Sequence, residues 1–197
     1  MRTDTSLTPT ATTLLEAARA AILENGYAAL STRSVAERAG VPLSQIHYHF
    51  GSKANLVLAL FEHENAKLLD RQAALYAGDE PLAEQWSRAC DYFDADLESG
   101  YVRLLHEMLA AGWSTPAIGE RVRQALDGWI SVLTGAFEHH ASRGVSLGPL
   151  TPAQAVALTS AAFLGAETII LAGQDTVPVR EALRAVGALW QNEEATT

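Results

Sequence analysis

The chain has 197 residues, of which 48% are hydrophobic, and its formal net charge at pH 7 is −9. This composition is sufficient for one or two domains with a buried core and excludes a low-complexity disordered protein. The single cysteine, Cys90, excludes an intramolecular disulfide framework and fits the reducing cytoplasm, where we expect the protein to reside.

The negative charge is unevenly distributed along the sequence. Residues 1–53 contain five basic and four acidic side chains, a net charge of +1, whereas the remaining residues contain nine basic and nineteen acidic ones, a net charge of −10. A near-neutral N-terminal part joined to an acidic body is compatible with nucleic-acid binding through a few placed contacts. It is not the pattern of a strongly electrostatic binder.

Apolar residues recur with helical spacing along almost the whole chain, and no sustained strand-like alternation occurs. The first predicted helices run from Pro9 or Thr13 to Asn25, from Ser31 or Thr32 to Ala39, from Leu43 to Phe50, and from Ser52 to the break at Gly78. Longer helices are predicted near 82–97, 102–113, 116–143 and 151–173, and a last one from Pro178. The sequence therefore predicts an all-α fold.

The segment Gly40–Leu56, GVPLSQIHYHFGSKANL, places two histidines, a tyrosine and a phenylalanine in four consecutive positions. A short helix, a tight turn through glycine and a second short helix form a helix-turn-helix, whose second helix lies in the major groove of DNA. Ile46 and Phe50 are four residues apart and are predicted to face inward. The outward side chains that could reach bases or phosphates are Leu43, Ser44, Gln45, His47, Tyr48 and His49.

Residues 14–60 resemble the N-terminal DNA-binding domain of the TetR/AcrR family of transcriptional regulators. The resemblance rests on motifs in a fixed order, namely Ala17-Ala18, Gly26-Tyr27, Thr32 through Val35-Ala36, Ala39-Gly40-Val41 and Phe50-Gly51-Ser52-Lys53. It implies a three-helix helix-turn-helix domain at residues 1–52, with residues 1–8 disordered. It also implies a larger helical domain for ligand binding and dimerisation at residues 53–197.

The function implied by this resemblance is a homodimeric repressor of transcription. A small, largely apolar or aromatic effector would release it from a pseudo-palindromic double-stranded operator. The implied DNA contacts come from Thr32, Arg33, Leu43, Ser44, Gln45, His47, Tyr48, His49 and Lys53. Pro42 departs from the residue usual in the family, and the N-terminal arm has only Arg2 as a basic residue. An alternative therefore stays open, a helical dimeric interaction module that has lost specific DNA binding.

Catalytic and metal-binding constellations are not evident, so we predict no enzyme activity, no cofactor and no metal site. His47 and His49 are two residues apart and point about 200° apart on a helix, so they cannot hold one ion together. The pair His139-His140 is typical of a solvated helix C-terminus, and Cys90 lies on an apolar stripe.

The aromatic residues of the long helices leave two interpretations open. They either fill an ordinary core or surround a cavity for an effector. The candidate effector-binding residues are Trp86, Phe93, His106, Trp113, Trp129, Phe163 and Glu167. Because a buried carboxylate is costly, Glu167 either meets solvent or an interface, or contacts a ligand together with His106 or Glu107.

The segment 155–173 is nearly long enough and apolar enough to cross a bilayer. Because it contains Glu167 and lacks flanking basic residues, we predict instead a helix buried on most sides by protein, without membrane association. Its small, smooth face and the last helix are predicted to form a two-fold four-helix dimer interface. The candidate interface residues are Leu158, Ala162, Gly165, Ile169, Leu183, Val186 and Trp190.

Overall fold

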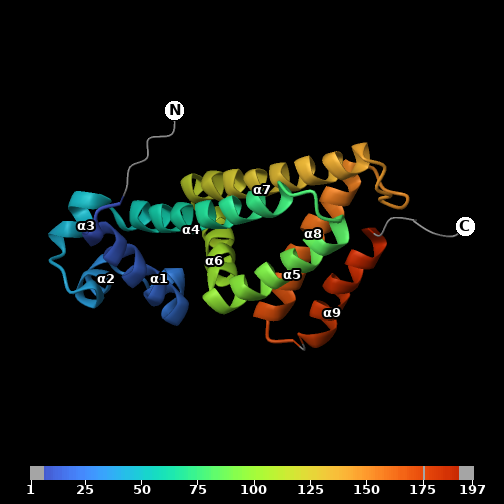
Figure 1. The fold of residues 1–197 in the computed structure, drawn as a ribbon. Coiled ribbons are helices and arrows are strands. Elements are labelled where there is room, and N and C mark those ends of the chain that lie inside the picture. The colour runs from blue at the N-terminus through green and yellow to red at the C-terminus, as the bar shows by residue number, and fades with distance from the viewer. Residues whose placement is uncertain (1–6, 175, 191–197) are drawn as a thin grey trace, which may run out of the picture. The chain divides into compact units, whose positions relative to one another are not determined.

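The computed structural model describes residues 7–174 and 176–190, which form nine α-helices and one short 3-10 helix (Figure 1). The elements are α1 (Pro9–Ala29), α2 (Thr32–Ala39), α3 (Ser44–His49), α4 (Lys53–Tyr76), α5 (Leu82–Ser99), α6 (Tyr101–Ser114), α7 (Pro116–Ser142), α8 (Pro152–Leu171), α9 (Val177–Val186) and the 3-10 helix η1 (Gly187–Trp190). Within these two ranges there is no strand, so the all-α prediction is confirmed.

The chain divides into two compact units that interleave along the sequence. The first unit combines Met1–Asn65 with Arg103–Arg123, and the second combines Ala66–Val102 with Gln124–Thr197. α4, α6 and α7 therefore each contribute residues to both units. The helix-turn-helix lies wholly in the first unit, and a domain boundary after residue 52 stays a prediction.

α1 forms the centre of the first unit, and both α2 and α3 pack on it. Its buried face is apolar and helically spaced, and includes Ala11, Leu14, Leu15, Ala18 and Ile22. The helix begins at Pro9 because the Thr8 hydroxyl accepts a hydrogen bond from the Ala11 N–H, 3.2 Å away. Residues 1–6, most of the segment predicted to be disordered, lie outside the described residues.

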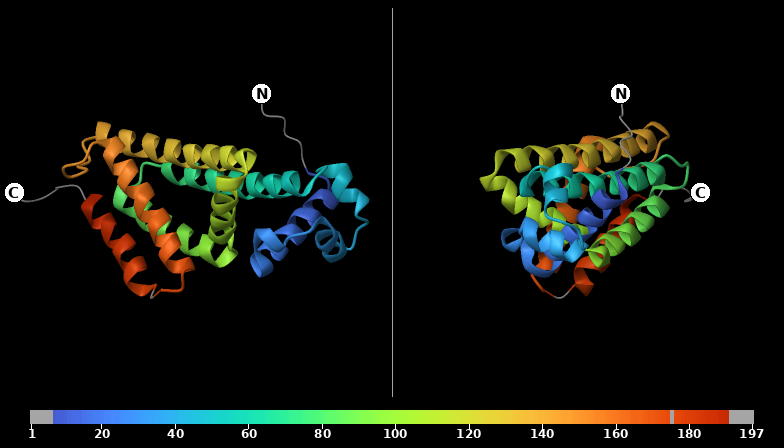
Figure 2. Two further views of the ribbon diagram at one scale, coloured as in Figure 1. Left: turned by 180° about the vertical axis from the view of Figure 1, so that it is seen from behind. Right: turned by 90° about the vertical axis from the view of Figure 1, so that its left-hand side faces the viewer.

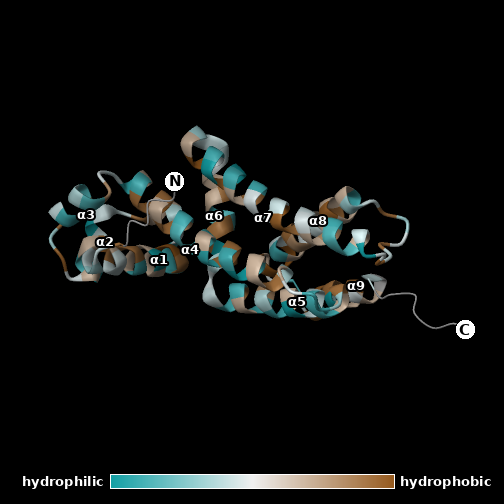
Figure 3. Cartoon of the chain, turned by 45° about the horizontal axis from the view of Figure 1, so that its top comes forward, coloured by the Kyte–Doolittle hydropathy of each residue, from teal (hydrophilic) through white to brown (hydrophobic). Residues whose placement is uncertain are grey.

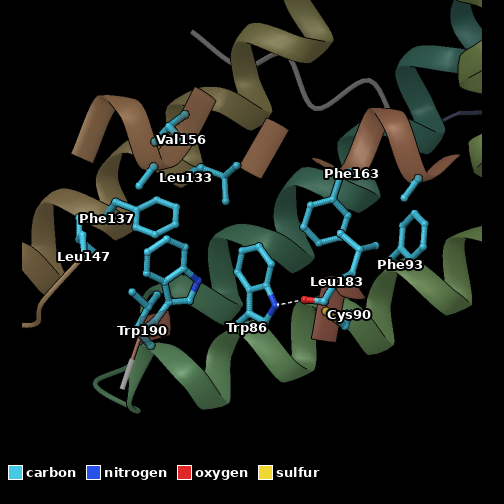
Figure 4. Packing of buried hydrophobic residues seen from close by; sticks show 13 residues of the cluster. Trp86, Cys90, Phe93, Leu133, Phe137, Leu147, Val156, Phe163, Leu183 and Trp190 are labelled. Carbon is cyan, nitrogen blue, oxygen red and sulfur yellow. Dashed lines mark hydrogen bonds between the residues drawn. The ribbon is translucent and has the colours of Figure 1, made fainter. Parts of the chain in front are cut away.

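The second unit has an aromatic core that α5, α7, α8, α9 and η1 share (Figure 4). Trp86 is enclosed in it and donates its indole N–H to the Leu183 carbonyl oxygen over 2.7 Å. Its ring lies 5.6 Å from that of Phe163 and 6.1 Å from that of Trp190, measured between centroids. Since α8 and α9 also run side by side (Figure 2), the last helix closes this core.

α8 is buried on one side only. By length and composition this helix could cross a membrane, and hydrophobic positions recur along it in Figure 3, but 33% of its apolar window is buried inside the chain. Leu158 is 51% exposed and Ile169 is 42% exposed. The prediction that protein buries this helix on most sides is therefore wrong for a single chain, and an apolar face is left open.

Two hydrogen bonds through the buried Gln85 connect α7 with α5 and with the loop before α5. The His140 Nε2 lies 2.9 Å from the Gln85 Oε1, and the Gln85 side-chain amide donates to the Gly78 carbonyl oxygen over 3.0 Å. Burial lowers the pKa of His140, and the neighbouring His139 and Arg143 lower it further, while Asp79 raises it. Contrary to the prediction of a solvated pair, His140 is buried and only His139 is exposed.

Because folding disfavours the proton on His140, the free energy of unfolding should fall as the pH falls below about 6.5, the ordinary pKa of histidine. In that range the unfolded chain binds a proton that the folded chain resists. His140→Gln keeps a hydrogen-bonding side chain and removes this contribution, so its urea unfolding should depend less on pH between 7 and 5. His63→Gln, the same substitution in the first unit, is the matched control and should behave as the wild type; equal pH dependence in all three proteins contradicts the prediction.

Candidate nucleic-acid interface

The turn between α2 and α3 is set by the backbone at Gly40. Gly40 has φ 67° and ψ 27°, the left-handed conformation that ends many helices. Its N–H donates to carbonyl oxygens of the last turn of α2, and the Val41 N–H donates to the Ala36 carbonyl oxygen over 3.1 Å. A Cβ at Gly40 would meet nothing within 4 Å, so the backbone angle rather than space requires glycine here.

α3 is held by Ile46 and presents its other sides to solvent. Ile46 is fully enclosed, with 0% of its surface exposed, whereas Phe50 is half-buried. Tyr48 is the most exposed side chain of the helix at 81%. Of the remaining predicted contact residues, Leu43, Ser44 and His47 are exposed, and Gln45 and His49 are half-buried. The surface is therefore polar and aromatic, and its side chains are of the kinds that contact bases or phosphates.

The two histidines of α3 have different surroundings. The His47 Nδ1 lies 3.2 Å from the Gly51 carbonyl oxygen, which can only accept, so Nδ1 carries the proton and Nε2 is left for another partner. The His49 ring meets that of Tyr48 edge to face, with centroids 4.9 Å apart. Within residues 7–174 and 176–190, no group of three or more His, Cys, Asp or Glu side chains is arranged to hold a metal ion.

Thr32 and Arg33 open α2 beside this surface. The Ser31 hydroxyl accepts a hydrogen bond from the Ser34 N–H and fixes the start of the helix, where Thr32 is half-buried and Arg33 exposed. The Arg33 guanidinium pairs with Glu37 over 3.0 Å, one helical turn away. Both side chains are mostly exposed, and such a pair is weak in water, so Arg33 can exchange its partner for a phosphate at small cost.

Lys53 is the first residue of α4 and follows the loop after α3. Its ammonium group is 4.7 Å from the centroid of the Tyr27 ring, within cation–π distance. Burial lowers the pKa of Lys53. The tyrosine ring therefore holds this cation at the helix N-terminus, where free backbone N–H groups also favour an anion.

Two further cations of the helix-turn-helix segment, Arg19 and Arg38, are engaged in ion pairs. Arg38 forms a two-pronged pair with Glu24, which joins α2 to α1, and hydrogen bonding to Arg38 lowers the pKa of Glu24. Arg19 lies 3.8 Å from Glu64 of α4. These pairs fix the helices of the unit against each other, and they leave little unbalanced positive charge for DNA.

A family model described as bacterial regulatory proteins of the tetR family matches residues 14–60, which run from α1 through the helix-turn-helix into α4. Residues 14–60 are therefore similar in sequence to the tetR family of bacterial regulatory proteins. A comparison with curated proteins gives no significant match.

Several solved structures share this fold over nearly the whole chain. Escherichia coli NemR in its reduced form is 20% identical with a TM-score of 0.79, and the match covers 95% of this chain and 100% of that one. A regulator from Saccharomonospora viridis in complex with choline is 21% identical with a TM-score of 0.76, covering 89% and 93%. Bacillus subtilis FadR in complex with stearoyl-CoA is 18% identical with a TM-score of 0.71, covering 91% and 96%.

The predicted effector-binding residues fall in both units. Trp86, Phe93, Trp129, Phe163 and Glu167 lie in the second unit, whereas His106 and Trp113 belong to the first. The expectation that Trp113 faces inward is wrong, because this side chain is 87% exposed near the end of α6. Glu167 is buried on the same side of α8 as Phe163, so the alternative that it faces solvent does not hold.

The predicted dimer residues also divide into two groups. On α8, Leu158 and Ile169 are exposed, Ala162 and Gly165 are half-buried, and a Cβ added to Gly165 would meet nothing within 4 Å. The expectation fails for Leu183 and Trp190, which are enclosed in the chain's own aromatic core. Helical spacing identified the apolar stripe of the last helix but not which surface covers it.

Sequence reasoning missed Tyr27 as part of the site. In the sequence Tyr27 forms one half of a Gly-Tyr break, and nothing near it points to residue 53. Their contact could be predicted only by combining two motifs, the aromatic residue after Gly26 and the lysine that begins α4. Both are needed, since the ring positions the cation.

Truncating one enclosed and one exposed side chain of α3 tests which side of the helix stabilises the fold. Ile46→Ala removes an enclosed side chain and should lower the free energy of unfolding by about 2–4 kcal/mol, measured in urea. Tyr48→Ala, on the exposed side of the same helix, should change that free energy by less than about 0.5 kcal/mol. Equal losses in the two variants would show that α3 does not present Tyr48 to solvent.

Proposed function

We propose that this TetR-family protein is a ligand-responsive transcriptional repressor that binds a pseudo-palindromic operator as a homodimer. The observation that carries the proposal is α3, whose polar and aromatic surface is exposed while Ile46 anchors it to the unit beneath. A helix held in this way, inside the family's DNA-binding segment, enters the major groove. Leu43, Ser44, Gln45, His47, Tyr48 and His49 then face the duplex.

Base reading is assigned to the N-terminal half of α3, and positioning to its flanks. The Gln45 amide can pair bidentately with adenine, and the exposed His47 can bond a base or phosphate through Nε2. Arg33 and Lys53 bind phosphates, and Thr32 supports them from the first turn of α2. All of these side chains are at least partly exposed and belong to the first unit.

The dimer interface is proposed on the exposed side of α8, through Leu158, Ala162, Gly165 and Ile169, with Val186 of α9 at its edge. An open apolar surface of this kind on a soluble helical protein favours association, and its small residues allow a second helix to approach closely. A two-fold axis through this surface would present two copies of α3 to two half-sites.

The effector site is proposed in the second unit, where Trp86, Trp129 and Phe163 meet. The Trp129 and Phe163 ring centroids are 6.0 Å apart. The Thr159 and Ser160 hydroxyl oxygens, one turn before Phe163, are buried without a hydrogen-bond partner in the described part of the chain. An apolar or aromatic molecule with one hydrogen-bonding group would replace these ring contacts and satisfy a hydroxyl. Two proteins of this fold have been solved in complex with choline and with stearoyl-CoA, which supports a ligand site in this chain.

The effector acts only if its affinity differs between the DNA-binding state and another state of the dimer. In the structure the aromatic rings contact one another, so a bound molecule has to separate α8 from α5 or α7. Because the same helix carries the proposed dimer surface, binding would change the relation between the two copies. Release from the operator follows when the two α3 helices no longer match the half-site spacing.

A second candidate is a dimeric interaction module without specific DNA binding. The pairing of Arg33, Arg38 and Arg19 with carboxylates favours it, because it reduces the positive charge available for phosphates. Pro42 does not, since its carbonyl oxygen accepts a hydrogen bond from the Gln45 N–H over 2.9 Å and so begins α3.

DNA selection from a random duplex library, followed by a mobility shift on the selected site, separates the two candidates. The repressor should select a two-fold related sequence, and Gln45→Ala should weaken binding to it by about 1–3 kcal/mol while non-specific binding is unchanged. Gln124→Ala, an exposed glutamine on α7, is the matched control and should bind as the wild type. No selected sequence at low salt, with a folded dimer, would favour the interaction module.

Charge placed on the open side of α8 tests the dimer. Leu158→Glu combined with Ile169→Glu should give a monomer in analytical ultracentrifugation and should abolish binding to the two-fold site, because each half-site alone is bound weakly. Ile130→Glu introduces the same charge at an exposed apolar position of α7 and should leave the dimer intact. An unchanged sedimentation coefficient in the double variant would contradict the proposed interface.

A further inference from the structure

A carboxylate from α6 reaches the point where α1 breaks. The Tyr27 backbone N–H donates to the Glu107 Oε2 over 3.1 Å, a contact between residues eighty positions apart. Both residues belong to the first unit. A break in a helix leaves N–H groups without their usual acceptors, and a charged acceptor makes a strong hydrogen bond to such a group. Glu107 therefore fixes the chain at the start of the Tyr27 turn.

The backbone at Gly26 makes room for this carboxylate. Gly26 has φ 78° and ψ 166°, a conformation that side chains rarely adopt, and a Cβ there would lie 3.2 Å from the Glu107 Oε1. The glycine thus serves two needs at once, the turn of the chain and the approach of Glu107. The Tyr27 carbonyl oxygen then accepts from the Leu30 N–H over 3.2 Å, which closes the turn.

The other end of Tyr27 holds the proposed phosphate contact. The Lys53 ammonium group lies over the Tyr27 ring, 4.7 Å from its centroid. Lys53 is the first residue of α4, directly after the loop that follows α3. A long lysine side chain has several rotamers. Fixing it in one of them for a phosphate contact costs conformational entropy, which weakens the contact. The ring restricts Lys53, and Glu107 restricts the residue that carries the ring.

We propose that Glu107 is a positioning residue for DNA binding, which acts through the Tyr27 backbone and ring to hold Lys53 in place for a phosphate. The proposal rests on the proposed function, because it needs the first unit to bind DNA. Glu107 does not touch DNA in it. Its role is to set the direction of a cation in a unit where Arg19, Arg33 and Arg38 are paired with carboxylates.

Salt dependence of DNA affinity measures the role of Lys53 separately from fold. The wild type and variants are titrated with the selected duplex between 50 and 200 mM salt, and the slope of log affinity against log salt is compared. Lys53→Met should make the slope less negative by about 0.9, the value for one phosphate contact. It should also lower the affinity by about tenfold. Glu107→Leu, which removes the acceptor, should do the same.

Two variants show that the acceptor rather than the charge is responsible. Glu107→Gln keeps an oxygen that can accept from the Tyr27 N–H and should retain the wild-type slope and an affinity within about threefold. Glu120→Gln makes the same change in charge at an exposed position of the first unit, where Glu120 pairs with Arg123 over 2.7 Å. It should bind as the wild type. A loss in Glu107→Gln equal to that in Glu107→Leu would overturn the proposal.

A double-variant cycle separates positioning from a general structural effect. If Glu107 acts through Lys53, Glu107→Leu should cause no further loss of affinity in a Lys53→Met background. Additive losses would overturn the proposal. Amide hydrogen exchange gives a readout without DNA: the Tyr27 amide should be protected in the wild type and in Glu107→Gln, and should exchange fast in Glu107→Leu. An unprotected Tyr27 amide in the wild type also overturns it.

The remaining outcomes are also decisive. If circular dichroism shows that Glu107→Leu does not fold, Tyr27→Leu replaces it, because this variant keeps the backbone N–H and removes only the ring. It should make the salt slope less negative by about 0.9, and an unchanged slope would overturn the proposal. If the wild type binds no DNA, the proposed function and this inference both fail. If the wild type binds and Glu107→Leu matches Glu120→Gln, only this inference fails.

Discussion

The burial of Ile46 is the constraint on which the rest of the site depends. α3 has six residues, too few for a helix to persist by itself in water, so its position comes entirely from what it packs on. Ile46 is fully enclosed and Phe50 closes part of the same side. Because neighbouring side chains on a helix have fixed directions, anchoring this one side also fixes where Gln45, His47 and Tyr48 point.

The fold could be predicted from the sequence wherever a local signal decided it. Helical spacing identified the all-α class, and glycine or proline marked most boundaries, as at Gly40 after α2 and at Pro152 in α8. The start of α1 had two candidates, Pro9 and Thr13. The structure uses the first because the Thr8 hydroxyl caps it, and an N-cap is a local interaction that the sequence contains.

What the sequence could not decide was which surface covers each apolar face. The helical spacing of Leu183 and Trp190 fits a dimer interface and a core equally well. The structure buries both in the chain's own aromatic cluster. Leu158 and Ile169 repeat in the same way and are left open. Trp113 has the spacing of an inward residue and is exposed. Periodicity shows which face of a helix is apolar, but not which segment packs on that face, because such contacts join distant parts of the chain. The hydrogen bond between Tyr27 and Glu107 is another contact of this kind.

The near-neutral charge of the first unit links these features. Arg38 is used to join α2 to α1 and Arg19 to reach α4, so cations that could attract DNA instead stabilise the arrangement of the helices. A binder with few free charges gains little from counterion release, and its affinity then rests on contacts that are correctly placed. In such a protein, rigidity substitutes for charge. The anchoring of α3 by Ile46 and of Lys53 by Tyr27 are two cases of this one requirement.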